Sequence, residues 1–317
     1  MRNAFPHAAV FFLLLAVPAH AGICKTENLM PEFFAFEAKT KDLTPEQRGD
    51  AFVGDIASRH EDFYTAEEYG DADKLRKSAT RFFDPAKPIQ FGGFGPLTDE
   101  HLHAVAANVM PAFDKAQADF AKTFPDFRCD ADIAFGVSLL HFDGHGYNDK
   151  TGREKMRFGI DMIALLHQPQ DLPAFFAHEL FHIYHAQALG VHPEDDDRTW
   201  WAMWAEGLAT YVSRQMNLPQ TEQQVLWIPS DLVAQMEKPG VMKETAKEML
   251  ADFDTENYRN WFAAGHSAPN LPARAGYFMG LRMAEELGRT RTLQELAHLT
   301  PEEVRPLAKA FLENQAR

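Results

Sequence analysis

Five consecutive residues in the middle of the chain, His178-Glu179-Leu180-Phe181-His182, have the types and the spacing of a metal-dependent hydrolytic centre. Residues four apart on a helix lie one turn above each other on the same face, so both imidazoles can bind one metal ion. Glu179 is rotated away from His178, so its carboxylate can reach a water on the metal without being a ligand. Zinc lowers the pKa of such a water to about 7, and the glutamate can take the proton and later give it to a leaving amine.

The residues around this pattern predict that it lies inside a buried helix. Asp171 can cap the helix, residues 172–189 continue it, and Gly190 is a natural stop. The flanking positions are mostly aromatic or aliphatic. Two imidazoles and a carboxylate are costly to bury among such side chains unless they have a partner. This cost favours a metal site over the alternative, two structural histidines on an amphipathic helix.

A second helical segment, predicted over about residues 199–216, carries Glu206, 24 positions after His182. The loop at residues 191–198 lets this helix fold back beside the first one. Glu206 can then complete a set of two histidines and one glutamate with a fourth position open for water. An open position is typical of a catalytic zinc site, whereas structural sites are closed by a fourth ligand. We therefore predict one Zn²⁺ per chain.

The chain resembles the gluzincin class of zinc metallopeptidases, in which an HExxH helix is followed by a second helix with a glutamate ligand. It is more closely similar to a group of bacterial exported proteins predicted to be zinc proteases. The resemblance covers about residues 130–290. It rests on residues 178–182 and 206–209, and more loosely on residues 158–161 and 276–280.

This resemblance implies a role for each matching position. His178, His182 and Glu206 would be the zinc ligands, and Glu179 would be the general base in hydrolysis of a peptide bond. Such a reaction also needs a hydrogen-bond donor for the developing oxyanion. By resemblance, Tyr277 is the candidate for that donor.

Two features of the site stay open at this point. His266 and Tyr258 are alternatives to Tyr277 as the oxyanion donor. Thermolysin-like enzymes orient a histidine with an aspartate four residues after the ligand glutamate, but here that position is Thr210. Metal-bound histidines usually donate to a carboxylate or a carbonyl, so Asp161 is our candidate for holding one of the rings. The alternative for Asp161 is a solvated strand carboxylate.

The elements that must position these residues predict an α+β, mostly helical, zincin-like fold with a small β-sheet and an HExxH active-site helix. We expect helices over residues 44–60 and 66–83, a long helix after Thr98 that Pro111 kinks or splits, and helices from residue 171 to the end. We expect strands over residues 131–139 and 158–164, paired as a hairpin through a turn-rich loop. If the fold follows the class, residues 157–161 form the sheet edge that binds a peptide by strand addition, and the preceding glycine-rich segment is a rim loop.

The N-terminus reads as a secretory signal peptide over residues 1–21, cleaved after Ala21, which predicts a periplasmic or secreted protein. Ile23 before Cys24 disfavours a lipid anchor, because such a site needs a small residue there. In an oxidising compartment Cys24 and Cys129 can pair, with two unpaired thiols as the alternative. Residues 22–97 form a helical N-terminal region, either separate from the catalytic domain at residues 98–317 or part of it.

The composition restricts the classes of partner that the protein is expected to bind. The chain has 317 residues, 45% of them hydrophobic, and a formal net charge of −15, so it is globular and acidic. This charge argues against nucleic acid and anionic lipid as partners. After signal cleavage no segment is long and apolar enough for membrane insertion. A peptide or protein is the expected partner, as the substrate.

These observations predict an exported zinc-dependent metallopeptidase that uses a zinc-activated water. Two alternatives remain open. One is a zinc hydrolase of a non-peptide bond, such as an ester or a cell-wall amide. The other is a non-catalytic, zinc-stabilised binding module, which Glu179 disfavours because a purely structural site does not need a carboxylate beside the metal.

Overall fold

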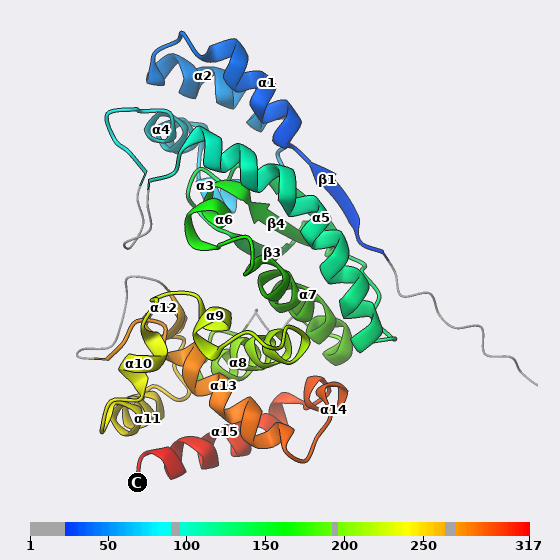
Figure 1. Ribbon diagram of the computed structural model, residues 1–317, viewed down its shortest axis with the longest axis vertical. Coiled ribbons are helices and arrows are strands. Elements are labelled where there is room, and N and C mark those ends of the chain that lie inside the picture. The colour runs from blue at the N-terminus through cyan, green and yellow to red at the C-terminus, as the bar shows by residue number, and fades with distance from the viewer. Residues whose placement is uncertain (1–22, 90–95, 192–195, 264–270) are drawn as a thin grey trace, which may run out of the picture.

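The computed structural model describes residues 23–89, 96–191, 196–263 and 271–317 (Figure 1). The predicted signal peptide and His266 lie outside the described residues. The fold is α+β and mostly helical with one small sheet, as predicted. The strands are β1 (Lys25–Asn28), β2 (Asp132–Gly136), β3 (Gly144–Asn148) and β4 (Glu154–Gly159). The α-helices are α1 (Met30–Thr40), α2 (Pro45–Asp55), α3 (Ala66–Tyr69), α4 (Ala72–Phe82), α5 (Asp99–Thr123), α6 (Ile160–Leu166), α7 (Leu172–Leu189), α8 (Thr199–Met216), α9 (Glu222–Leu226), α10 (Leu232–Met236), α11 (Val241–Ala251), α12 (Tyr258–Phe262), α13 (Ala275–Gly288), α14 (Leu293–Ala297) and α15 (Pro301–Gln315).

The sheet has the strand order β1-β2-β4-β3, in which only β3 is antiparallel to its neighbour. The predicted hairpin between the strands at residues 131–139 and 158–164 is therefore wrong, because β2 and β4 run parallel. The partner of β4 in the hairpin is β3, which forms within the segment expected to be a rim loop. Consequently β4 is internal, and the predicted edge at residues 157–161 is corrected to β3.

The apolar run at residues 158–164 is also not one strand. Strand β4 ends at Gly159 and helix α6 begins at Ile160, and all seven helical residues are buried. A short segment buried on every side has no periodic contrast between faces, so its pattern cannot distinguish a strand from a helix.

Two of the predicted helices differ from expectation in continuity. The helix expected over residues 66–83 is divided into α3 and α4, because Gly70 has a φ of 74° and Asp71 starts a new helix as its N-cap. In contrast, α5 continues through Pro111 without a break. Phe113 lies edge-on to Phe135 and Phe176, and this packing holds α5 against the sheet and α7 where the proline removes a hydrogen bond.

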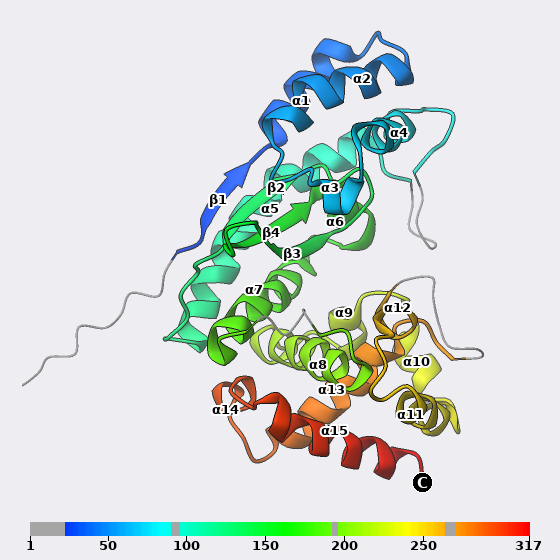
Figure 2. The ribbon, with the colours of Figure 1, turned by 180° about the vertical axis from the view of Figure 1, so that it is seen from behind.

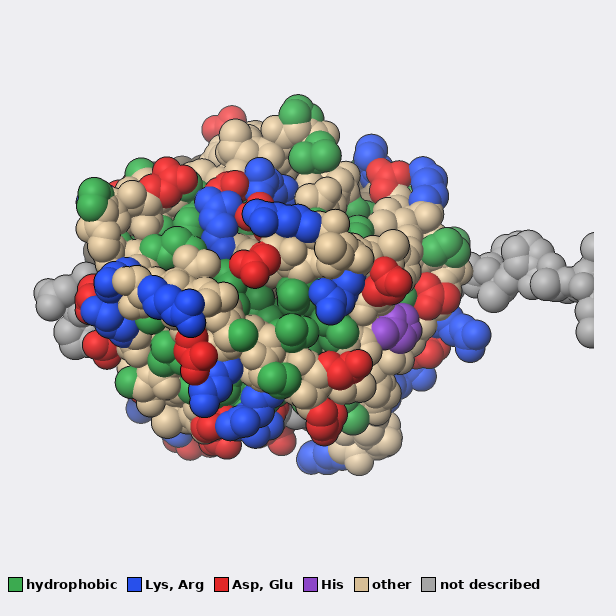
Figure 3. All heavy atoms as spheres, turned by 90° about the horizontal axis from the view of Figure 1, so that it is seen from below, with side chains coloured by type: hydrophobic (Ala, Val, Ile, Leu, Met, Phe, Trp, Pro, Cys, Tyr) green, Lys and Arg blue, Asp and Glu red, His purple; other side chains and the backbone are tan. Residues whose placement is uncertain are grey.

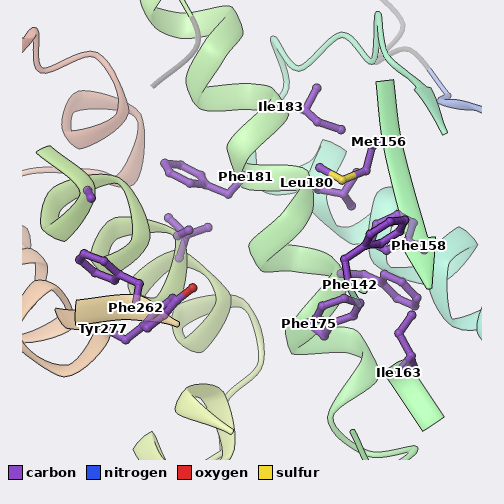
Figure 4. Packing of buried hydrophobic residues seen from close by; sticks show 14 of the residues in the cluster. Phe142, Met156, Phe158, Ile163, Phe175, Leu180, Phe181, Ile183, Phe262 and Tyr277 are labelled. Atoms are coloured by element: carbon purple, nitrogen blue, oxygen red, sulfur yellow. The ribbon is translucent and has the colours of Figure 1, made fainter. Parts of the chain in front are cut away.

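Aromatic side chains join the sheet to the helix of the HExxH pattern. Phe158 of β4 lies 5.8 Å from Phe175 and 5.3 Å from Phe176 of α7, measured between ring centroids. Figure 4 shows Phe158 and Phe175 together between the strand and the helix. In Figures 1 and 2, α7 lies between the sheet and α8, so its opposite face is free to meet the C-terminal helices.

Helices α8 and α13 cross with their backbones in contact. A Cβ atom on Gly207 would lie 2.1 Å from the carbonyl carbon of Gly280, and one on Gly280 would lie 2.1 Å from the carbonyl oxygen of Met203. Only glycine allows this approach. The crossing places Glu206, next to Gly207, beside the first turn of α13.

The N-terminal residues are attached to the sheet. Cys24 and Cys129 form a disulfide with 4.9 Å between their Cα atoms, so the alternative of two unpaired thiols is wrong. Strand β1 follows Cys24 directly and pairs with β2. The disulfide therefore joins the beginning of β1 to the segment that leads into β2.

The surface charge and the hydropathy of the helices are the last two features of the fold. Figure 3 looks onto the face at the foot of Figure 1, and acidic and basic side chains are interspersed over it. Within the described ranges, no helix combines the length and the apolar character that crossing a membrane requires.

Candidate metal centre

His178, His182 and Glu206 meet in one place. Their nearest ligand atoms form a triangle: 3.0 Å between the two Nε2 atoms, 3.3 Å from Nε2 of His178 to Oε2 of Glu206, and 3.7 Å from Nε2 of His182 to the same oxygen. A tetrahedral zinc with bonds of about 2.0–2.1 Å separates its ligand atoms by roughly 3.3 Å. The donor set and its spacing therefore fit zinc. In the part of the chain that the structure describes, this is the only such group of three or more side chains.

The arrangement of the three candidate ligands follows from the packing of helices α7 and α8. Helix α7 has the predicted bounds and ends at Gly190, whose φ of 68° is left-handed. Asp171 precedes it without capping it through a side-chain bond, and instead accepts a hydrogen bond from the Gln168 backbone. Helix α8 is tied to α7 by Ser213, whose hydroxyl donates to the carbonyl oxygen of Ala174 at 2.7 Å. The two helices thus pack side by side, with both histidines facing Glu206.

Burial gives these side chains the protonation states that a metal ligand needs. Desolvation lowers the pKa of His178 to about 4, so its ring is neutral at pH 7. Burial opposes ionisation of Glu206, but the interactions with His178, His182 and Tyr258 together outweigh burial and hold the pKa of the carboxyl group below its usual range. A neutral imidazole and an ionised carboxylate are the forms that bind zinc.

A tyrosine orients the glutamate. The hydroxyl of Tyr258 donates to Oε1 of Glu206 at 2.8 Å, which leaves Oε2 facing the two histidines. Tyr258 was an alternative for the oxyanion donor, but its hydroxyl is engaged with Glu206. Sequence reasoning did not find this contact, because the two residues are 52 positions apart.

Tyr277 faces the same centre from the first turn of α13. Its hydroxyl lies 3.5 Å from that of Tyr258, and its ring centroid is 6.2 Å from that of His178. Burial raises the pKa of Tyr277, so the hydroxyl keeps its proton and can donate. Figure 4 shows Tyr277 beside Phe262, across from the HExxH helix.

Glu179 approaches the edge strand of the sheet. A Cβ atom built on Gly144, the first residue of β3, would lie 2.7 Å from the carboxyl carbon of Glu179. The glycine therefore makes room for this carboxylate. The sequence signal for it is the glycine-rich segment, whose composition predicts a loop.

The centre opens into a cleft of about 570 Å³. Its walls include residues 140–146 from the β3 side, α7, α8, and the segments around Trp227 and Phe262. Arg274 also lines this cleft, immediately before α13. The walls combine apolar side chains with polar and charged groups, and a cleft of this size beside a candidate metal centre is typical of a substrate site.

Asp161 does not hold a histidine ring, so that prediction is wrong. It is fully buried at the start of α6, and its carboxylate accepts hydrogen bonds from the backbone N–H and hydroxyl of Ser138 and from the backbone N–H of Leu140, at 2.6, 3.1 and 2.7 Å. Leu139 and Leu140 both have positive φ angles, 54° and 70°. Asp161 therefore fixes a strained turn that leads into the cleft wall.

The remaining histidines near the centre have other surroundings. His185 is fully buried beside the rings of Phe181 and Trp201, and burial lowers its pKa to about 3. His141 and His145 line the outer cleft, where Nδ1 of His141 lies 3.1 Å from a carboxylate oxygen of Glu68. The tryptophans at positions 200, 201 and 204 are core residues.

Comparison with known proteins gives one match. Residues 140–309, more than half of the chain, match a family model described as "Putative zinc dependent peptidase (DUF5700)". The matched segment contains the three candidate ligands, Glu179 and Tyr277. No curated protein and no solved structure matches the chain. The predicted zinc cofactor is confirmed by this family together with the buried triad that could hold a metal ion.

Proposed function

The chain belongs to the DUF5700 family of zinc-dependent peptidases, and we propose that it hydrolyses peptide bonds at the centre between α7 and α8. In this proposal His178, His182 and Glu206 bind the catalytic zinc. Glu179 is the general base. The observation that carries the proposal is the buried triangle of two Nε2 atoms and one carboxylate oxygen beside a substrate-sized cleft.

The chain's own residues then have distinct tasks in the reaction. Zinc, when bound, supplies a Lewis acid and a water of lowered pKa. Glu179 would take the proton from the attacking water and return it to the leaving amine. Tyr277 keeps its proton and donates a hydrogen bond to the oxyanion that develops on the scissile carbonyl. Tyr258 holds Glu206 in the orientation that binding requires.

We further propose that β3 binds the peptide backbone. It is the sheet edge that borders the cleft, and Gly144 at its start contacts Glu179. An edge strand offers unpaired N–H and C=O groups that an extended peptide can pair with. This role replaces the one expected for residues 157–161.

Export through a signal peptide at residues 1–21 also remains a proposal. The disulfide between Cys24 and Cys129 supports it, because disulfides persist in oxidising compartments.

The experiment that tests the activity is Glu179→Gln in the zinc-loaded protein. Hydrolysis of a mixed peptide library, followed by mass spectrometry, should fall by at least about 100-fold, since general acid–base catalysis contributes about 10²–10⁴. Zinc content should stay near one per chain in both proteins. Glu313→Gln, at an exposed position on α15, is the control and should retain activity. Full hydrolysis by zinc-loaded Glu179→Gln would reject the proposal.

A further inference from the structure

Arg274 is a cation in the cleft without a hydrogen-bonded or ion-paired partner among the described residues, although its charge helps to lower the pKa of Asp143 in the same wall. No hydrogen bond or ion pair joins its guanidinium to the described residues, and its Nε is buried without a partner. It is the only lysine or arginine among the residues that form the described cleft wall. The residue is half-buried, and its buried Nε is a donor without an acceptor, which is costly and indicates that an anionic ligand completes the site.

The position of Arg274 is fixed by its neighbour. The guanidinium carbon lies 4.2 Å from the ring centroid of Tyr277, which is in turn 6.2 Å from the ring centroid of His178. Stacking on the ring face leaves the edge of the planar guanidinium available for two parallel hydrogen bonds. Such a fork matches the geometry of a carboxylate.

The backbone of Arg274 is strained, which argues that the side chain is needed. Its φ of 61° is left-handed, a conformation that glycine or asparagine adopts at lower cost. Strain of about 1 kcal/mol or more at a cleft residue is a recurrent feature of ligand sites.

We propose that Arg274 binds the C-terminal carboxylate of the peptide substrate, so that the protein acts as a carboxypeptidase. This inference rests on the proposed function. The terminal carboxylate is the anion that every peptide has, whatever its side chains. Other charged groups of the cleft, such as Asp143, Asp196 and Asp197, are acidic. They disfavour binding of a substrate with several acidic side chains. One cation in an acidic cleft therefore fits one terminal carboxylate.

The distances also limit how many residues the protein can remove from the C-terminus of a peptide. An extended residue spans about 3.3 Å, and the ring of Tyr277 lies 4.2 Å from the guanidinium carbon of Arg274 and 6.2 Å from the ring of His178, so Arg274 lies close to the metal centre. A peptide that places its scissile carbonyl at the metal centre therefore has one or two residues between that bond and Arg274. The expected products are single amino acids or dipeptides from the C-terminus.

The test compares one peptide sequence with a free C-terminus, with a C-terminal amide, and with a C-terminal amide preceded by glutamate. The zinc-loaded wild-type protein should cleave the free acid with a kcat/KM on the order of 10- to 100-fold higher than either amide. Mass spectrometry should show loss of one or two C-terminal residues. Cleavage of acid and amide at equal rates would overturn the inference. Rescue by the glutamate side chain would overturn the assignment to the terminal carboxylate.

Variants of Arg274 give the matching evidence. Arg274→Asn relieves the backbone strain, so its thermal stability should not fall, but its preference for the free acid should vanish through a higher KM. Arg274→Lys should keep part of the preference. Arg305→Met is the control, because Arg305 also lies over an aromatic ring, that of Phe253, outside the cleft. It should discriminate like the wild type, and retained discrimination in Arg274→Asn would overturn the inference.

A binding measurement separates this inference from the proposed function. Calorimetry with the zinc-loaded Glu179→Gln protein should show tighter binding of the free acid than of the amide, without any turnover. If wild-type protein hydrolyses both peptides equally, the peptidase proposal stands and the role of Arg274 fails. If it hydrolyses no peptide, the peptidase proposal fails, and binding of acid and amide with equal affinity would then also reject the role of Arg274.

Discussion

Gly144 has no side chain, and this leaves room for the carboxylate of Glu179, the proposed general base. The added methyl group in Gly144→Ala would lie within 3.0 Å of three carboxyl atoms of Glu179 and must displace them. A general base shifted by about 1 Å can cost on the order of 100-fold in rate. We expect kcat to fall by about 10- to 100-fold while elemental analysis shows unchanged zinc.

A second glycine provides the control for that experiment. Gly54 of α2 has open space where a Cβ would be, so Gly54→Ala should leave kcat unchanged and raise stability by up to about 1 kcal/mol through helix propensity. Equal kcat values for Gly144→Ala and wild type would contradict the placement of Glu179 against β3.

Tyr258 and Tyr277 differ in what they contact, and this difference is testable. Tyr258→Phe removes the hydrogen bond to Oε1 of Glu206, and loss of such a supporting contact typically costs 10- to 100-fold in metal affinity. Competition with a chromogenic chelator should show weaker zinc binding. Tyr277→Phe should bind zinc as the wild type does but turn over more slowly. The assignment is wrong if the two variants have the same zinc affinity.

The ligands could be predicted from sequence, whereas the residues that support them could not. Helix periodicity alone brings His178 and His182 together, and a short connection brings Glu206 beside them. The contact between Tyr258 and Glu206 depends on how α12 packs against α8, which no local pattern encodes. Asp161 shows the same limit, because its partners are backbone groups of a distant turn.

Among the elements, the turn at residues 138–140 is the one whose geometry depends most on a single side chain. Asp161→Ala would leave the buried N–H and hydroxyl of Ser138 and the partly buried N–H of Leu140 without their acceptor, and the positive φ angles of Leu139 and Leu140 would lose their support. We expect unfolding by denaturant to show a loss of about 3–5 kcal/mol. Zinc content of the folded protein should be unchanged.

The matched control for this turn is an exposed carboxylate. Asp119→Ala on α5 removes surface ion pairs with Lys115 and Lys122, which are worth about 0–1 kcal/mol. A stability loss in Asp161→Ala no larger than in Asp119→Ala would refute the structural role. Loss of zinc from a stable Asp161→Ala protein would instead restore the role predicted from sequence.

The prediction of elements succeeded at helix ends, where capping depends on neighbouring residues. It failed for strands that pair with residues distant in the sequence. Thr44 and Gln47 form a capping box at the start of α2, and Thr300 and Glu303 form one at the start of α15. Strand β3 was missed because its glycines are turn formers in isolation, and only pairing with β4 makes them a strand. The identity of a sheet edge is likewise a property of the assembled sheet.

At the scale of the whole molecule, the N-terminal helical region contacts the wall of the cleft. Tyr64 and Tyr69 donate to the carbonyl oxygens of Val137 and Ser138, at 3.0 and 2.9 Å, in the segment that continues into the strained turn. Arg157 of β4 donates to the carbonyl oxygen of Phe63 at 2.9 Å. We therefore propose that residues 22–97 belong to the same domain as the metal centre.

Glu37 makes the stability of a second contact, that of α1 with the start of α5, depend on pH. It lies on α1 with Asp99 of α5 and Arg48 of α2 nearby, and burial and Asp99 raise its pKa to about 7 although Arg48 opposes the shift. The folded state therefore binds a proton that the unfolded chain, with a pKa near 4.5, releases earlier. The stabilisation is fully present below about pH 4.5 and is lost as the pH rises through about 7.

Glu37→Gln keeps the neutral form at every pH and so removes this dependence. From pH 5 to pH 8, the free energy of unfolding should shift in favour of the variant relative to wild type by up to about 3 kcal/mol. Denaturant titrations of both proteins with excess chelator measure the difference without a contribution from metal binding. A constant difference across this range would mean that Glu37 is solvated and that α1 does not pack closely against α5. A change in the variant's favour would show that the N-terminal helices and the catalytic half share one buried, titrating contact.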